Sequence, residues 1–253
     1  MRNGFFPIFA KGRVLKRESI EYLRDFPYDL ASLVYENYSD GILCGFSISS
    51  EDGWTHITKG ALKYLGNIIV VPENTVAMAE SSYGKFLYAK LIMGKSYETE
   101  DSKICPMELK VDTREAVGRY EIELGRFCLN SGAILRCEYD SFSDLRTPEN
   151  TLDLTRVSYA GYDAPTLHPR VLKEYALAVL AYAHDAADVA FAVMCLNASI
   201  IHKSSIQWHI AKKINSSYVD YTLPKLYDKL EELLPQIGLK KRERQRGKGP
   251  AIT

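Results

Sequence analysis

The chain has 253 residues, of which 46% are hydrophobic and 25% are charged, and its 32 basic side chains are balanced by 32 acidic ones. This is the composition of an ordinary soluble protein, and the balanced charge gives no overall positive field that would attract a nucleic acid. The length suits two modest domains, each able to bury a core of its own.

The N-terminal sequence and the cysteines both indicate the cytosol. The first ten residues carry an apolar patch that Pro7 interrupts, and this patch is too short for a signal peptide. Five cysteines, an odd number without a CxxC pair, argue against a disulfide framework and against a zinc knuckle. We therefore expect a cytoplasmic protein with free thiols, most of them buried.

A short helical lead over residues 1–38 opens the predicted fold. Apolar side chains fall on one face of residues 16–25, and Phe26 and Pro27 mark the end of this helix. A second helical piece is expected over residues 29–35, before a polar loop that ends at Gly41.

From Ile42 onward the pattern becomes that of strands. A first hairpin is predicted over residues 42–58, with a turn at residues 51–53, and a second over residues 61–71, with Gly66 and Asn67 as turn residues. Further strands are expected at residues 86–93, 108–111, 120–124, 127–129 and 133–137, with surface loops at 94–105 and 140–150. Residues 152–159 are expected to form a final strand or a linker. Closely spaced strands predict an antiparallel β-sandwich or small barrel over residues 39–160.

A helical bundle is predicted over residues 161–238. Residues 175–183 form an uncharged run, which is too short for a membrane span of about 20 residues and therefore indicates a helix buried on most faces. Thr166 is its expected cap, and Pro169 fits its first turn. Further helices are expected after Asp185, over residues 204–214 and over residues 223–234. The predicted fold class is α+β.

The last segment, residues 239–253, is strongly basic. Its candidate nucleic-acid contacts are Lys240, Lys241, Arg242, Arg244, Arg246 and Lys248. Such a composition favours a disordered tail, and a run of cations gains affinity for nucleic acid by releasing counterions. Aromatic side chains for base stacking are absent from the run. A solvated tail is the commoner meaning, and nucleic-acid binding is the alternative function.

Two groups of polar side chains are candidates for chemistry, and each has a plainer interpretation. His184, Asp185 and Asp188 are compatible with a metal site or an acid–base pair, although carboxylates at a helix start are expected from the helix dipole alone. His202 and His209 lie seven residues apart but have no third ligand in a zinc-binding pattern. Packing and capping explain both groups.

Other motifs give no support to catalysis. The sequence has no GxxxxGK[ST] motif, and the segment around Ser158 does not match GxSxG. Asp140, Asp144 and Glu149 could gather a cation, but the spacing is not that of an EF-hand, and turn formation suffices to explain them. We therefore predict no catalytic residue, no cofactor and no metal site, and expect a protein that is not an enzyme.

Two parts of the sequence resemble a family carried by prophages and phage tail-like gene clusters of Gram-positive bacteria. The first part is residues 38–46 with 57–69, where glycines separate short strands; the second is residues 139–154 with 159–161 and 167–169. Members of such families have sometimes been labelled helicases without helicase motifs, and this chain has no helicase motifs either.

The resemblance implies a structural protein of a phage tail or baseplate, with no catalytic residues to carry over. Its partners would be other tail or baseplate subunits or a second copy of itself, and it could be incorporated into a phage-like particle during virion assembly. Edge strands of the hairpins over residues 42–71 suit protein–protein interaction. Tyrosines in or beside the strands are expected to help form an interface: Tyr64, Tyr83, Tyr88, Tyr97, Tyr120 and Tyr139.

Overall fold

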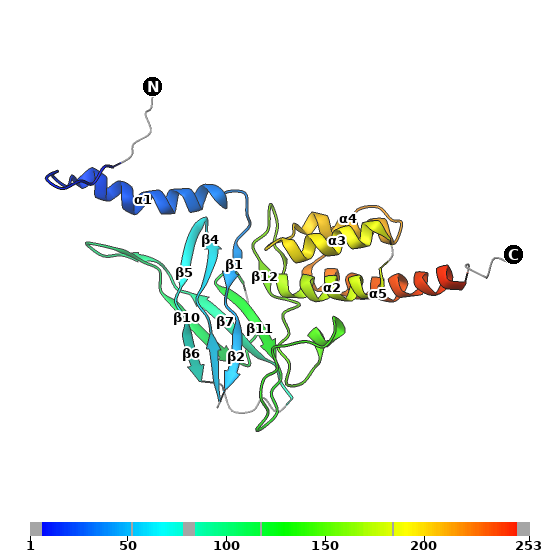
Figure 1. Cartoon of the computed structure of the whole chain (residues 1–253). Coiled ribbons are helices and arrows are strands. Elements are labelled where there is room, and N and C mark those ends of the chain that lie inside the picture. The colour runs from blue at the N-terminus through cyan, green and yellow to red at the C-terminus, as the bar shows by residue number, and fades with distance from the viewer. Residues whose placement is uncertain (1–6, 52, 78–83, 117, 184, 247–253) are drawn as a thin grey trace.

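The computed structural model describes residues 7–51, 53–77, 84–116, 118–183 and 185–246. It confirms the predicted α+β class, with an N-terminal helix, several largely antiparallel sheets and C-terminal helices. Figure 1 shows α1 extending to one side of the strands and α2 to α5 lying on the other. The sheets formed by the described residues do not close into a barrel.

The described residues of the β part form four sheets. The five-stranded sheet has the order β13-β12-β1-β4-β5 and consists of Thr166–Leu167, Ser158–Tyr159, Gly41–Gly45, Gly60–Tyr64 and Asn67–Val71. A three-stranded sheet has the order β10-β7-β11: Met107–Asp112, Leu87–Met93 and Glu121–Phe127. A second has the order β2-β3-β6: Ile48–Glu51, Trp54–Ile57 and Asn74–Ala77. The fourth is the hairpin of β8 (Tyr97–Glu98) and β9 (Lys103–Ile104).

The pairing of β1 with β12 is parallel and brings a late segment of the chain back to an early one. Ala160 donates a main-chain hydrogen bond to the carbonyl of Ile42 at 2.8 Å. A Cβ at Gly41 would lie 2.9 Å from the nitrogen of Ala160, and Gly41 also has a φ of +146°. Only glycine allows this close approach of two backbones without strain.

The first hairpin is shorter than the predicted 42–58, because it consists of β2 and β3 alone while residues 42–45 belong to β1 of the five-stranded sheet, and the turn of the second hairpin is shifted by one residue. On β3, Thr55 and Ile57 are buried while Trp54 and His56 are exposed, as the alternation predicts. In the second hairpin the turn residues are Leu65 and Gly66, with φ values of 48° and 78°, instead of Gly66 and Asn67. Two consecutive positive φ values match the twist of a tight hairpin.

Several segments differ from the predicted strands. The expected loop at 94–105 contains the β8–β9 hairpin. Of the strand expected at 127–129 only Phe127 is in a strand, as the last residue of β11, and the strand expected at 133–137 is replaced by a loop with an isolated bridge at Arg136. Likewise, only Ser158–Tyr159 of the strand expected at 152–159 forms a ladder. These loops pack through side chains such as Leu135 and Leu152, so an apolar pattern here reflects burial without a neighbouring strand.

The helices are α1 (Arg17–Val34), α2 (Pro169–Tyr182), α3 (Ala186–Asn197), α4 (Lys203–Lys213) and α5 (Leu223–Arg246). α1 corrects the prediction of two short helices, because it continues through Pro27. A proline inside a helix removes one main-chain hydrogen bond, and on this exposed helix water can reach the carbonyl left without a donor. α5 is also longer than predicted and continues through Pro235.

The start and surface of α2 differ from the prediction. His168 caps the helix by accepting a hydrogen bond from the main-chain nitrogen of Arg170, whereas Thr166 lies in β13 and donates to the carbonyl of Ile201 at 2.6 Å. Pro169 occupies the first turn, as predicted. The helix is buried on one side only, since Leu177 and Tyr182 are exposed.

The C-terminal end of α1 is fixed to the five-stranded sheet by one buried lysine. Lys63 on β4 donates from its Nζ to the carbonyls of Tyr35, Glu36 and Tyr38 at 2.7, 2.9 and 2.7 Å. Carbonyl groups at a helix C-terminus have no partner within the helix and carry partial negative charge. The ammonium group therefore sets the direction in which α1 leaves the sheet.

Buried apolar side chains form one connected cluster from Ile42 to Ile237, and this cluster includes residues of both the strands and the C-terminal helices. The predicted division into residues 1–38, 39–160, 161–238 and 239–253 stays a prediction, which limited proteolysis can test through the fragments that resist cleavage.

We predict that Lys63→Met loosens α1. The substitution keeps the apolar stem but removes three charge-assisted hydrogen bonds, so the free energy of unfolding should fall by roughly 1.5–3 kcal/mol. Amide hydrogen exchange should accelerate over residues 31–38. The matched control is Lys59→Met, an exposed lysine in the loop before β4. Unchanged protection of α1 in the Lys63 variant would contradict the anchoring role.

Candidate functional site

The acidic pair at the start of α3 forms an ion-pair cluster with a lysine of α4. Lys213 Nζ lies 2.6 Å from both carboxylate oxygens of Asp188 and 3.0 Å from Oδ2 of Asp185. Asp185 also caps α3 by accepting from the nitrogen of Ala187, as predicted. His184 lies outside the described residues. The structure thus brings the two acids together, with a cationic side chain between them.

A histidine and a tyrosine pack beside this cluster. His209 stacks on the ring of Phe191, with ring centroids 3.9 Å apart, and its Nε2 lies 3.1 Å from the hydroxyl of Tyr175. Burial lowers the pKa of His209 from 6.5 to about 4, because the charged ring would lose its water. The ring is therefore neutral at physiological pH and serves as a packing group.

The second predicted acidic group, which consists of Asp140, Asp144 and Glu149, also forms ion pairs and hydrogen bonds within the chain. Arg136 makes two hydrogen bonds to Asp144, one of them from Nη2 at 2.6 Å, and these bonds hold the pKa of the Asp144 carboxyl well below its usual range. Asp140 lies near the same arginine, with 3.8 Å between charged atoms. Glu149 instead accepts from the side-chain amide of Asn130 at 2.8 Å.

The other residues considered for chemistry lie apart from one another. His202 stacks on Tyr162 with centroids 5.2 Å apart, and Ser158 is half-buried in β12. Within the described ranges, no group of three or more His, Cys, Asp or Glu side chains could hold a metal ion. Among the helices that the structure describes, none is long and apolar enough to cross a membrane. In the part of the chain that the structure describes, no cysteine forms a disulfide, and Cys128 and Cys195 are buried.

The basic segment begins as part of α5. The helix runs to Arg246, so it includes five of the six candidate nucleic-acid contacts, namely Lys240, Lys241, Arg242, Arg244 and Arg246. Lys248 lies outside the described residues. Where disorder was predicted from residue 239, the structure continues the helix for two more turns, and the assignment of nucleic-acid contacts to these side chains stays a prediction.

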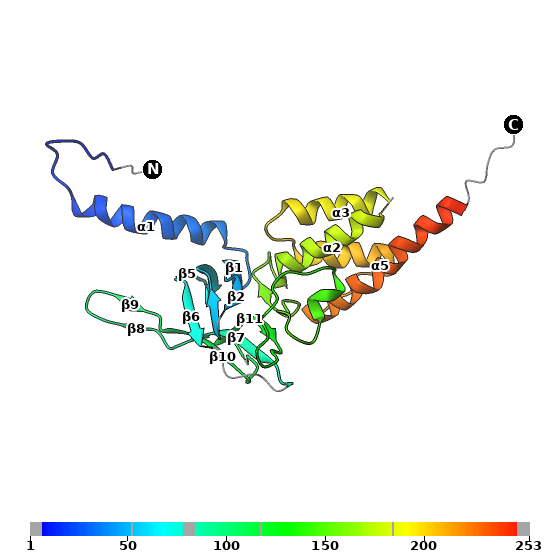
Figure 2. The same cartoon turned by 60° about the horizontal axis from the view of Figure 1, so that its bottom comes forward.

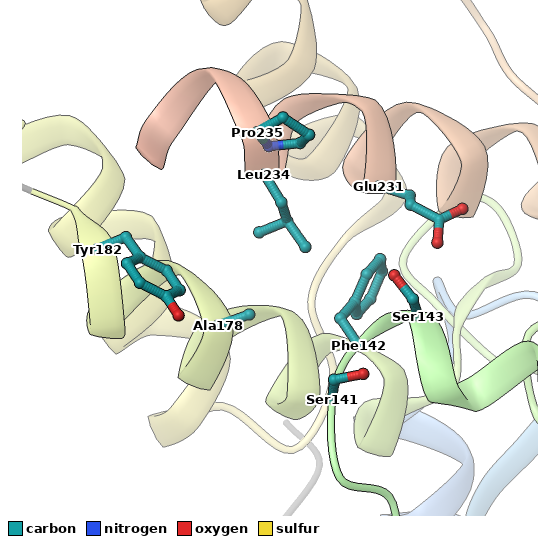
Figure 3. Close-up of a pocket in the computed structure, with 8 residues that line it drawn as sticks. All are labelled: Ser141, Phe142, Ser143, Ala178, Tyr182, Glu231, Leu234 and Pro235. Carbon is teal, nitrogen blue, oxygen red and sulfur yellow. The ribbon is translucent and has the colours of Figure 1, made fainter. Parts of the chain in front are cut away.

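A pocket of ≈ 430 Å³ lies where the loop before the short 3-10 helix η1 (Ser143–Arg146) meets α2 and α5. Figure 3 shows Ser141 and Phe142 on the loop, Ala178 and Tyr182 on α2, and Glu231, Leu234 and Pro235 on α5; Ser143 completes the lining. The walls are mostly apolar, with Glu231 as the acidic side chain among them. A pocket of this size and lining can accept an apolar group that carries a positive charge.

Phe142, which lines this junction pocket, belongs to an aromatic cluster. Phe142 stacks on Tyr227 of α5 with centroids 4.6 Å apart and meets Tyr175 of α2 edge to face at 5.4 Å. The hydroxyl of Tyr227 donates to the carbonyl of Phe142 at 2.8 Å, and the guanidinium of Arg146 lies 4.0 Å above the Tyr227 ring. Both stacking and the cation–π contact stabilise this arrangement.

An exposed apolar patch lies around the β8–β9 hairpin, which Figure 2 shows reaching out on the same side of the strands as α1. Tyr97 and Ile104 are opposite each other in the hairpin. Met107 pairs with Met93 on one side of β7, and on the other the carbonyl of Tyr120 accepts a hydrogen bond from Met93 at 2.8 Å. We call Tyr97, Ile104, Met107 and Tyr120 the arm patch; each is 36–52% exposed.

The six tyrosines expected at an interface fall into three groups. Tyr97 and Tyr120 are exposed, Tyr64, Tyr88 and Tyr139 are buried or half-buried, and Tyr83 lies outside the described residues. The hydroxyl of Tyr139 donates to the carbonyl of Leu152 at 2.6 Å, and burial raises the pKa of Tyr64. Core packing therefore explains part of the tyrosine supply.

No protein-family model and no curated protein matches the chain. Among solved structures, the chain is similar to one in the TssK–TssF–TssG baseplate subcomplex of the type VI secretion system, with 12% identity, a TM-score of 0.41 and coverage of 91% of this chain and 99% of that one. A crystal structure of TssK has 8% identity, a TM-score of 0.43 and coverage of 91% and 71%. The baseplate complex from the type VI secretion system has 10% identity, a TM-score of 0.38 and coverage of 92% and 100%.

We predict that Tyr227→Phe destabilises the fold through the junction. The change leaves the Phe142 carbonyl without its hydroxyl donor while preserving the stacked ring, so the free energy of unfolding should fall by about 1–3 kcal/mol. Chemical denaturation measures this loss. Tyr182→Phe, at the more exposed side of the same pocket, is the matched control and should change stability by less than about 0.5 kcal/mol. Equal midpoints for the two variants would contradict the role of the hydroxyl.

We also predict a loss of stability in acid that depends on His209. Its folded pKa is lowered from 6.5 to about 4, so between these values the unfolded chain binds a proton that the folded chain does not. The contribution of neutral His209 to the free energy of unfolding is therefore complete above about pH 6.5, and roughly 3 kcal/mol of it is lost as the pH falls to 4. Unfolding measured over this range should be less pH-dependent in His209→Gln, whereas His56→Gln, at an exposed site on β3, should retain the wild-type slope.

Proposed function

We propose that this protein is a non-enzymatic structural subunit of a phage-derived tail or baseplate-like particle, and that it works by docking other subunits of that particle. The observation that carries the proposal is the arm patch, two of whose residues, Tyr97 and Ile104, lie on the projecting β8–β9 hairpin. A projection places apolar side chains where a neighbouring subunit can surround them, and this arrangement suits assembly.

The chemistry of the arm patch supports a protein partner. Arg119 donates to the hydroxyl of Tyr120 at 2.8 Å, and its guanidinium lies 4.9 Å from the centre of the same ring. Tyrosine, methionine and arginine are enriched at protein interfaces, and tyrosine and arginine contribute disproportionately to binding energy. An exposed group of these residue types therefore favours docking of a protein surface.

The edge of the five-stranded sheet offers a second contact. β5 is the last strand of that sheet, and Val70 on it is 61% exposed. The outer edge of a terminal strand presents main-chain donors and acceptors that a strand of another chain can pair with. This is the edge-strand docking that the hairpins over residues 42–71 predict.

The test is binding to the proteins encoded beside this gene. A Tyr97→Ser and Ile104→Ser double variant should bind a tail-type neighbour at least about tenfold more weakly than the wild type, since loss of a buried anchor costs upwards of about 1.4 kcal/mol. Ile134→Ser changes an exposed isoleucine of the β part outside the arm patch and is the matched control. Calorimetry or surface plasmon resonance gives the affinities.

Two results would overturn the particle role. The first is that the intact protein binds none of the neighbouring gene products. The second is tight, salt-sensitive binding of DNA or RNA that disappears when residues 239–253 are removed, because phosphate contacts give a steep salt dependence. The second result would favour the nucleic-acid-binding alternative.

A further inference from the structure

The junction pocket contains a carboxylate that no described cation pairs with. The first twelve residues of α5 include three acids, of which Glu231 lines the pocket. Asp228 forms an ion pair with Arg146. Glu232 forms one with Lys229. Among the described residues Glu231 has neither an ion pair nor a side-chain hydrogen bond, so its negative charge is open to a ligand.

The sequence of α5 explains why Glu231 stays unpaired. Side chains three and four residues apart are neighbours on a helix. The residues at these positions around Glu231 include no cation: Tyr227, Asp228, Leu234 and Pro235. Because proline has no N–H, Pro235 also removes the α-helical donor to the main-chain carbonyl of Glu231. The helix therefore leaves this residue with more acceptor capacity than its own neighbours satisfy.

The pocket has an apolar end and a polar end. Figure 3 shows Tyr182 and Ala178 on one side of Leu234, and Glu231 and Ser143 on the other. The volume of ≈ 430 Å³ lies within the range of small-molecule sites, which are mostly apolar and carry a few polar groups that fix the orientation of the ligand. A ligand that follows this pocket from end to end is itself apolar at one end and polar at the other.

The polar end selects a cation. An ammonium group has three donors and no acceptor, so it can donate both to the carboxylate of Glu231 and to the hydroxyl of Ser143 at the same end of the pocket. A neutral apolar molecule would remove water from the carboxylate without replacing its hydrogen bonds. An anion would in addition be repelled by the charge of Glu231.

We propose that the junction pocket is a binding site for a small organic cation, a primary amine on an apolar body. The ammonium group lies at Glu231, and the apolar body lies against Phe142, Leu234 and Tyr182. Because α2, α5 and the loop before η1 all contribute to the site, a ligand that binds only the folded chain also stabilises the junction of these segments.

Titration of the full chain with three matched probes tests the site. Phenylbutylamine is the cationic probe, and phenylbutanol and phenylbutyrate carry a neutral and an anionic head group on the same kind of body. A ligand of about ten non-hydrogen atoms binds with an affinity on the order of 1 mM, which NMR chemical shifts can measure.

The amine should shift the signals of residues 141–143, 178–182 and 231–235. The alcohol and the acid should bind at least about tenfold more weakly, because charge-assisted hydrogen bonds are roughly twice as strong as neutral ones. Equal binding of the three probes, or shifts by the amine at residues elsewhere in the chain, would overturn the proposal.

Two glutamine substitutions on α5 isolate the charge of Glu231. Glu231→Gln keeps the shape of the side chain, so the fold should be retained while the amine binds at least about tenfold more weakly and loses its advantage over the alcohol. Glu232→Gln is the matched control, because that carboxylate pairs with Lys229, and it should bind the amine as the wild type does. Equal affinity of the amine for both variants would contradict the role of Glu231.

A substitution that fills the pocket supplies a second readout. Ala178→Met places a longer side chain in the lining and should abolish binding of all three probes. Circular dichroism and the denaturation midpoint establish that this variant is folded. If the folded variant bound the amine as tightly as the wild type, the amine would lie outside the pocket and the assignment would fail.

This site goes beyond the particle role and does not rest on it, because no residue that lines the pocket belongs to the arm patch. A chain that binds the amine but no neighbouring gene product would remove the particle role alone. A chain that binds no amine, but whose pocket residues shift when a neighbouring gene product binds, would overturn the small-molecule site and assign the pocket to a protein partner.

Discussion

The position of Phe142 between Tyr175 and Tyr227 is the constraint on which the arrangement of strands and helices depends. The loop that carries Phe142 follows the β strands, and the two tyrosines belong to α2 and α5, so this one stacked group joins segments about 85 residues apart. Because the rings are large and buried, a shift of either helix would open a cavity or force a clash. Phe142 also lines the junction pocket, together with residues of α2 and α5.

Local sequence signals predicted the elements whose partners lie nearby. The alternation around Thr55 and Ile57 predicted β3, and Asp185 predicted the start of α3. The second turn moved by one residue because Leu65 accepts a positive φ, which a leucine seldom does; its main-chain nitrogen donates to Asp40, 25 residues earlier. A contact so distant in the sequence leaves no trace in the local pattern.

The candidate metal-binding and acid–base residues show the same limit of local sequence signals. Asp188 and Asp144 each looked like part of a ligand set, and each is neutralised by a cation, Lys213 or Arg136, that the sequence pattern could not pair with it. The reverse holds for α1, where periodicity predicts an apolar face but cannot say whether anything covers it. Lys90 gives a further example. It is buried on β7, and its Nζ donates to the carboxylate of Asp112 on β10 at 2.7 Å, a pairing that the local pattern of β7 cannot indicate.

The anchoring of α1 has a consequence for how this helix can change over evolutionary time. Lys63 holds three main-chain carbonyls, and every amino acid supplies a carbonyl whatever its side chain. The direction of α1 is therefore independent of the side chains along its exposed surface. Related chains could exchange the whole exposed surface of the helix, and with it the choice of partner, while one lysine keeps the geometry of attachment constant.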